Sequence, residues 1–179
     1  MILTLAALAS VSGCETAAEL AAGGLFHEAL PYDVRFTETS AGPADWTSYQ
    51  SIRIGPITSG FMHGTVPLTL LADLQPYAQM EIDKEGVLQG QGKTILVTGE
   101  VVDFYEGDSR GLRIIGFGDN PVLAIHAKFS DRASGKVLSE AVLASQSKSL
   151  REWEEMVSRG LGHSVVKFLA SKGIVKPKN

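Results

Sequence analysis

The stretch PVLAIHAKFSDRASGKVLSEAVLASQS, residues 121–147, decides the fold. It contains two runs rich in apolar and β-branched residues, separated by Arg132-Ala133-Ser134-Gly135. The Asp131 carboxylate can accept hydrogen bonds from the turn backbone, and Gly135 can adopt the left-handed conformation that a tight turn requires. The sequence therefore predicts a β-hairpin and, with it, an antiparallel sheet.

The remaining elements follow from hydrophobic spacing on either side of this hairpin. Apolar residues alternate where a strand is expected, and they recur three and four apart where a helix is expected. Ser149 and Glu152 would form a capping box at the start of the last helix, and Gly173 would end it. The expected elements are strands at 32–38, 51–57, 93–105, 121–131 and 136–147, a helix from Thr65 that Pro76 kinks or splits before a second piece at 77–88, and a helix at 150–171.

The order β-α-β-β-β-α from residue 51 onward predicts an α+β fold. We expect a mainly antiparallel sheet of about four strands with two helices packed on one face. The expected organisation is a signal peptide at 1–13, a tether and candidate edge strand at 14–48, an α+β domain at 49–175 and a tail at 176–179.

Composition excludes one class of partner and singles out one residue. The 179-residue chain has 16 Lys and Arg against 20 Asp and Glu, a net charge of −4. A mildly acidic chain is a poor electrostatic partner for a phosphate backbone, so we expect no nucleic-acid binding. The single cysteine, Cys14, can form no disulfide within the chain and needs another explanation.

The N-terminal residues MILTLAALASVSG form a short apolar stretch that ends in small residues, the pattern of a secretory signal and its cleavage site. The stretch is shorter than the ~20 apolar residues that span a bilayer. Val11-Ser12-Gly13-Cys14 resembles the lipobox of bacterial lipoprotein precursors, which are cut before the cysteine. The sequence departs from that pattern in one respect, because no Lys or Arg precedes the apolar stretch.

The lipobox resemblance implies that Cys14 is lipidated, with a thioether-linked diacylglyceryl group and an acyl group such as palmitate on its new amine. Two or more chains anchor a protein stably to a bilayer, whereas one chain binds only marginally. The alternative is a signal anchor or a buried helix in which the cysteine is accidental. Glu15 follows the cysteine, and the absence of Asp there favours the outer membrane, at its periplasmic face.

Motifs for catalysis and cofactor binding fail on their context. Residues 90–94, GQGKT, match the end of a phosphate-binding loop, but Val87 stands where its first glycine belongs and a strand follows. The Ser-x-x-Lys at 145–148 lies at a strand end and lacks its partner motifs. The four histidines show no metal-ligand spacing, so packing or surface roles are expected for them. The sequence predicts no cofactor, no metal and no enzyme activity.

One loop is a candidate contact site. Residues 106–118, EGDSRGLRIIGFG, place Arg110 and Arg113 between glycines, with Phe117 close behind. An Arg can bond several carbonyls or carboxylates at once, and glycines allow sharp turns. These three residues are therefore candidates for binding a partner or a ligand. The alternative is a loop that Arg pins to Asp103, Asp108 or backbone carbonyls.

The same loop, together with Asp131-Arg132-Ala133-Ser134-Gly135, resembles a family of bacterial lipoproteins known only as a domain of unknown function. The resemblance covers about 49–174 and rests on a Gly-x-x-Arg…Arg…Gly-x-Gly loop and an Asp-x-x-x-Gly hairpin. Asp119-Asn120-Pro121 departs from the small residues that family members often carry there. The resemblance implies no established activity.

Three functional hypotheses remain open at this point. The first is a non-enzymatic binding or assembly module of the cell envelope, which would use a sheet edge or the 110–118 loop. The second is a carrier of a small apolar or glycan ligand in a pocket between sheet and helices. The third is a hydrolase, which clustering of Asp103, Asp108 and His126 in one cleft would support.

Overall fold

The computed structural model describes residues 30–42, 44–60, 66–106, 120–149 and 151–174. Five strands, two α-helices and a short 3-10 helix make up this part of the chain. They are β1 (Tyr32–Ala41), η1 (Trp46–Ser48), β2 (Ser51–Ser59), α2 (Leu68–Lys84), β3 (Thr94–Tyr105), β4 (Val122–Asp131), β5 (Val137–Ser147) and α3 (Trp153–Ser171).

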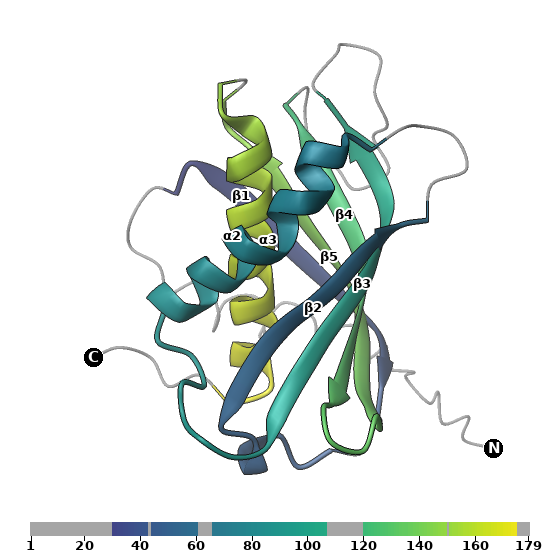
Figure 1. Ribbon diagram of the computed structural model, residues 1–179, viewed down its shortest axis with the longest axis vertical. Coiled ribbons are helices and arrows are strands. Elements are labelled where there is room, and N and C mark those ends of the chain that lie inside the picture. The colour runs from purple at the N-terminus through teal and green to yellow at the C-terminus, as the bar shows by residue number, and fades with distance from the viewer. Residues whose placement is uncertain (1–29, 43, 61–65, 107–119, 150, 175–179) are drawn as a thin grey trace, which may run out of the picture.

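All five strands lie in one sheet, in the order β1-β5-β4-β3-β2 (Figure 1). Three of the four strand pairs are antiparallel, and β2–β3 is parallel. The parallel pair arises because α2 carries the chain from the end of β2 back to the start of β3, and such a crossover leaves the two strands in the same direction. The predicted α+β class is confirmed, but the sheet has five strands instead of about four, and one pair is parallel.

Both helices lie on one face of the sheet, as predicted (Figure 1). Alternate side chains of the strands point to this face because successive residues in a strand face opposite sides. They meet the apolar stripes of the helices in one core, in which the largest fully buried side chains include Phe129, Phe168, Leu70, Leu143 and Leu161. Phe129 and Phe168 stack with ring centroids 4.3 Å apart at the centre of this layer.

The predicted edge strand is β1, and it pairs with β5 along almost its whole length, from Tyr32↔Ser147 to Ala41↔Ser139. Its side chains alternate as expected of an edge strand with one buried face. Tyr32 is 3% exposed and Phe36 packs on the core. The sheet therefore includes a strand that lies N-terminal to the domain start expected at residue 49.

The predicted hairpin between β4 and β5 is confirmed. Asp131 Oδ1 accepts hydrogen bonds from the backbone N–H groups of Ala133 (3.0 Å) and Ser134 (2.8 Å). Gly135 has a φ of +71°, the left-handed conformation that glycine adopts without strain.

Both helices begin later than expected. α2 begins at Leu68, with Pro67 and not Thr65 at its N-cap. Pro76 does not split α2, which continues to Lys84, and the ribbon bends along its length, the other outcome expected at this proline (Figure 1). α3 begins at Trp153, and no capping box forms, because Ser149 Oγ accepts from the N–H of Arg151 instead (3.0 Å). The predicted C-terminal end is confirmed, because Gly173 follows α3 with a φ of +75°.

Candidate functional site

A buried carboxylate, Glu81, lies on the inner face of α2 between the helices and β1. Helical spacing places it there, since Leu74, Ala78 and Ile82 share the same buried stripe. Its side chain is 1% exposed. A buried charge of this kind is stable only when it is paired and hydrogen-bonded.

Three elements supply the partners of Glu81. The Tyr32 hydroxyl of β1 donates to Oε1 over 3.0 Å, and Arg159 Nε of α3 donates to Oε2 over 3.1 Å. Lys84 Nζ lies 3.6 Å from Oε1. Arg159 in turn pairs with Glu155 one turn earlier, at 3.2 Å. The carboxylate thus joins α2, α3 and β1 by charged contacts.

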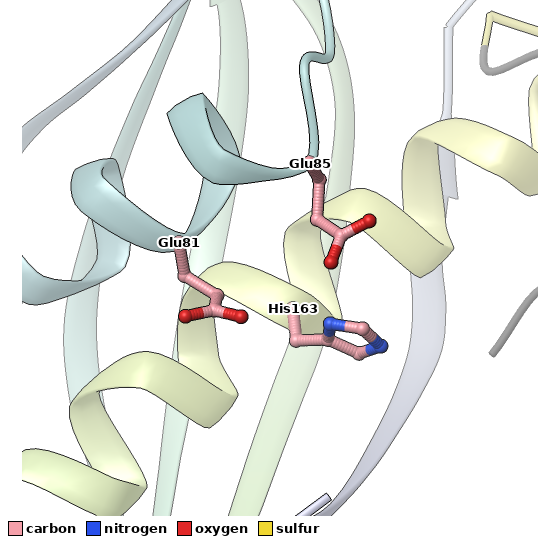
Figure 2. Close-up of side chains that lie close together, drawn as sticks. All are labelled: Glu81, Glu85 and His163. Atoms are coloured by element: carbon pink, nitrogen blue, oxygen red, sulfur yellow. The ribbon is translucent and has the colours of Figure 1, made fainter. Parts of the chain in front are cut away.

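His163 lies on α3 beside this carboxylate and is fully buried. Figure 2 shows its imidazole facing the Glu81 and Glu85 carboxylates, and one ligand atom from each of the three lies within 4.8 Å of the others. Imidazole and carboxylate are the donors that Zn²⁺ uses in proteins, so the donor set itself suits a metal. We call Tyr32, Glu81, Glu85, Arg159 and His163 the Glu81 cluster.

The contacts of Glu81 argue against a resident cation. Both of its oxygens already accept hydrogen bonds, one from Tyr32 and one from Arg159. A divalent ion bound to either oxygen would lie beside the Arg159 guanidinium and the Lys84 ammonium, which repel it. The residues present therefore do not fit a metal as they are arranged, and the cluster is a charged connection between helices and sheet.

The environment of the cluster shifts the pKa values of several of its members. Burial lowers the pKa of His163 to about 4, helped by the nearby Lys167, so the imidazole is neutral at pH 7. Burial alone would raise the pKa of Glu81, but hydrogen bonds from Arg159 and Tyr32 hold that pKa below its ordinary value. Burial and the Glu81 charge raise the pKa of Tyr32.

The sheet face away from the helices carries a second feature. Val122, Ala124 and Ala144 form a small buried apolar cluster there, on the strand positions that alternate with the main core. At the same end, Asp103 Oδ1 and the Tyr105 hydroxyl are buried and have no hydrogen-bond partner among the residues that the structure describes. Burial raises the pKa of Asp103, against one backbone hydrogen bond from Phe104.

The structure does not describe the candidate contact and lipidation residues predicted from sequence. Cys14, Arg110, Arg113 and Phe117 lie outside the described residues, as do His27, His63 and Asp108. His126 lies on the outer sheet face, where its Nε2 is 3.4 Å from Glu140 Oε2. His163, the other described histidine, is buried on α3 in the Glu81 cluster. The sequence analysis did not identify Glu81. The feature that could have revealed it is a carboxylate within the otherwise apolar stripe of the helix.

Two helices over one face of a five-stranded sheet define the class as a two-layer α+β domain. No family model and no curated protein matches the chain. Its fold is similar to the PelC dodecamer structure from Paraburkholderia phytofirmans, at 16% identity and a TM-score of 0.49, over 77% of this chain and 96% of that one.

Two further solved structures are similar at lower scores. A "putative lipoprotein" from Caulobacter crescentus is 11% identical with a TM-score of 0.34, over 71% of this chain and 90% of that one. A DUF4136 family protein from Bacteroides thetaiotaomicron is 8% identical with a TM-score of 0.38, over 81% of this chain and 98% of that one. At these values the likeness carries no conclusion about function. Within the described part of the chain, neither helix has the length and apolar character to cross a membrane.

Proposed function

We propose that this protein is a lipid-anchored lipoprotein of the bacterial outer membrane, facing the periplasm, that acts by binding another envelope component and not by catalysis. The observation that supports the proposal best is Val11-Ser12-Gly13-Cys14, which places the only cysteine of the chain at the end of a charge-free apolar stretch. Seventeen residues separate Cys14 from the first strand residue, Tyr32. Such a length can serve as a tether between lipid and domain.

The layout of the folded domain narrows how a partner could bind. Edge strands can pair with an added strand when their backbone groups are free. On β2, the N–H of Ile54 donates to Gln79 Oε1 (2.9 Å), and Pro56 has no N–H to offer. On β1, the carbonyl of Arg35 accepts from Ser164 Oγ (2.7 Å). Helix side chains therefore occupy part of both edges, which favours side-chain contacts over strand addition.

The core bears on the alternative, a carrier with a pocket between sheet and helices. Side chains that face each other across this layer, such as Leu70, Leu143 and Val165, are 0% exposed. Their packing leaves little room for an apolar ligand there. The binding module is therefore the function we propose.

Lipid labelling tests the anchor directly. Cells expressing the full chain are grown with radiolabelled palmitate, and the wild type is compared with Cys14→Ala. We expect label in the wild type alone, and the wild type in the outer-membrane fraction. Equal labelling of both forms would disprove the anchor.

Crosslinking tests the binding role separately. The lipidated full chain is crosslinked in cells, purified and analysed by mass spectrometry. Cys14→Ala is the control, because it removes only the lipid anchor. We expect an envelope component captured by the wild type and lost or reduced in the variant. A wild type that is lipidated but crosslinks to no envelope component, and whose deletion leaves the envelope unchanged, would contradict the binding role and not the anchor.

A further inference from the structure

A pocket of about 290 Å³ opens at the end of the sheet where η1, the start of β3 and the β4–β5 hairpin meet. Three segments that are distant in sequence contribute to its wall. The side chains that matter for its chemistry are those of Asp45, Tyr49, Lys93, Asp131, Ser134 and Lys136. We call it the hairpin-end pocket.

The acidic part of this wall is already occupied by hydrogen-bond donors. Asp131 Oδ1 accepts from the backbone N–H and the hydroxyl of Ser134 (2.8 and 2.9 Å), and Oδ2 accepts from the Tyr49 hydroxyl (3.0 Å). The Ser134 bonds, with those from Tyr49 and Ala133, hold the pKa of Asp131 below its usual value. Asp45 Oδ1 likewise accepts from the N–H and hydroxyl of Thr47 (3.2 and 2.6 Å). These bonds hold the two carboxylates in fixed orientations within the wall.

The two lysines of the wall, Lys93 and Lys136, differ from the aspartates in this respect. Lys93 Nζ lies 5.9 Å from the centroid of the Tyr49 ring, a cation–π position that keeps the ammonium at the pocket wall. Across the residues that the structure describes, neither Lys93 nor Lys136 has a carboxylate within ion-pair distance, whereas Lys128, Lys148 and Lys172 each have one. The pocket therefore presents two ammonium groups whose hydrogen-bond donors are available to a ligand.

We propose that the hairpin-end pocket binds a small anionic ligand, through a carboxylate or phosphate group held between Lys93 and Lys136. Lysine recognises either group as a point charge. The volume is at the lower end of the range for ligand sites, which suits a compact molecule. This ligand site is separate from the proposed lipid anchor and does not depend on it.

Calorimetric and NMR titrations of the full chain test the site. The probes are inorganic phosphate, glucuronate as a compact carboxylate, and glucose as a neutral control. We expect saturable binding of at least one anion and none of glucose. Binding of phosphate alone or of glucuronate alone assigns the anionic group, and either result supports the site.

Variants show whether the two lysines hold the anion. Lys93→Gln and Lys136→Gln should each weaken binding roughly two- to fivefold, the range for a solvent-exposed ion pair, and the double variant about tenfold. Lys128→Gln is the matched control, since this lysine lies on the outer sheet face and pairs with Glu140. It should bind like the wild type. Both lysines are on the surface, so the variants should melt at the wild-type temperature.

Three outcomes would overturn the proposal. The first is an absence of saturable binding of either anion. The second is unchanged affinity in the double variant. The third is an equal loss in Lys128→Gln, which would show that the anions respond to overall charge and not to the pocket.

Discussion

Glu81 is the residue on which the buried polar contacts converge, and its removal tests the Glu81 cluster. Glu81→Gln takes away the charge that pairs with Arg159 and should lower the free energy of unfolding by about 2 kcal/mol. The loss should be smaller than for a fully buried pair, because Arg159 is 26% exposed and keeps Glu155. Urea denaturation measures the change. Glu140→Gln is the control, at an exposed pair, and should change stability by less than about 1 kcal/mol. Equal losses would contradict the role of Glu81.

His163 predicts a stability loss in mild acid. Its pKa is about 4 in the folded protein and near 6.5 when unfolded, so the unfolded chain binds the proton more readily. Stability should therefore be full above pH 6.5 and fall as the pH drops to 4, by at most about 3 kcal/mol. The charged groups close to the ring are those of Glu81, Glu85, Lys84 and Lys167. Chemical denaturation across this pH range measures the slope.

A variant separates this histidine from the carboxylates. Glu81 has a lowered pKa, so its contribution is lost as the pH falls below its ordinary value near 4.5. His163→Gln should make the free energy of unfolding nearly independent of pH between pH 6.5 and 4.5. The steeper loss of stability below pH 4.5 should remain. An unchanged slope in His163→Gln would show that another group titrates.

For Asp103 we expect a pH dependence of stability opposite to that of His163. Within the described part of the chain its Oδ1 is buried without a hydrogen-bond partner, and burial raises its pKa, so the folded protein holds this proton more tightly than the unfolded chain does. Asp103→Asn should raise the free energy of unfolding by on the order of 1 kcal/mol at pH 7. It should leave that free energy unchanged at pH 3, where both side chains are neutral. Thermal melts at the two pH values measure this. Asp33→Asn, which breaks an exposed pair with Lys148, is the control and should give no gain.

At the scale of elements, the helix–helix contact depends on a glycine. A Cβ on Gly162 would meet the backbone of α2 at Ala78, with the Ala78 Cα at 2.9 Å. Gly162→Ala should push the helices apart and cost about 2 kcal/mol, measured by denaturation. A Cβ on Gly160 instead meets the Ser145 hydroxyl first. Ser145→Gly should therefore restore part of the loss in Gly160→Ala and none of the loss in Gly162→Ala.

At the scale of the whole molecule, β1 is part of the folded unit. It closes one side of the sheet against β5, supplies Tyr32 to Glu81, and supplies Glu38 to Lys172 at 2.6 Å. A chain that starts at Gly42 should therefore melt well below the full chain or fail to fold, as circular dichroism would show. An unchanged melting temperature would mean that the domain begins near residue 49, as the sequence suggested.

The sequence by itself determined the elements. Local patterns are sufficient for this, because the hairpin at Asp131–Gly135 and the C-terminal end of α3 at Gly173 depend only on turn chemistry, and the strands and helices depend on hydrophobic period. The same local signals failed at Ser149, where a nearer N–H competed for the hydroxyl. The lipobox is also local and stays a prediction from sequence.

Only the tertiary structure decided which distant residues meet. The parallel β2–β3 pair follows from the path of α2, and the place of β1 follows from its pairing with a strand more than a hundred residues later. Glu81 meets Tyr32 and Arg159 across 49 and 78 residues of sequence. The hairpin-end pocket likewise joins Lys93 and Lys136, which lie just before β3 and β5. Charges find partners through the packing of whole elements, and a single sequence carries no local signal of which partner that will be.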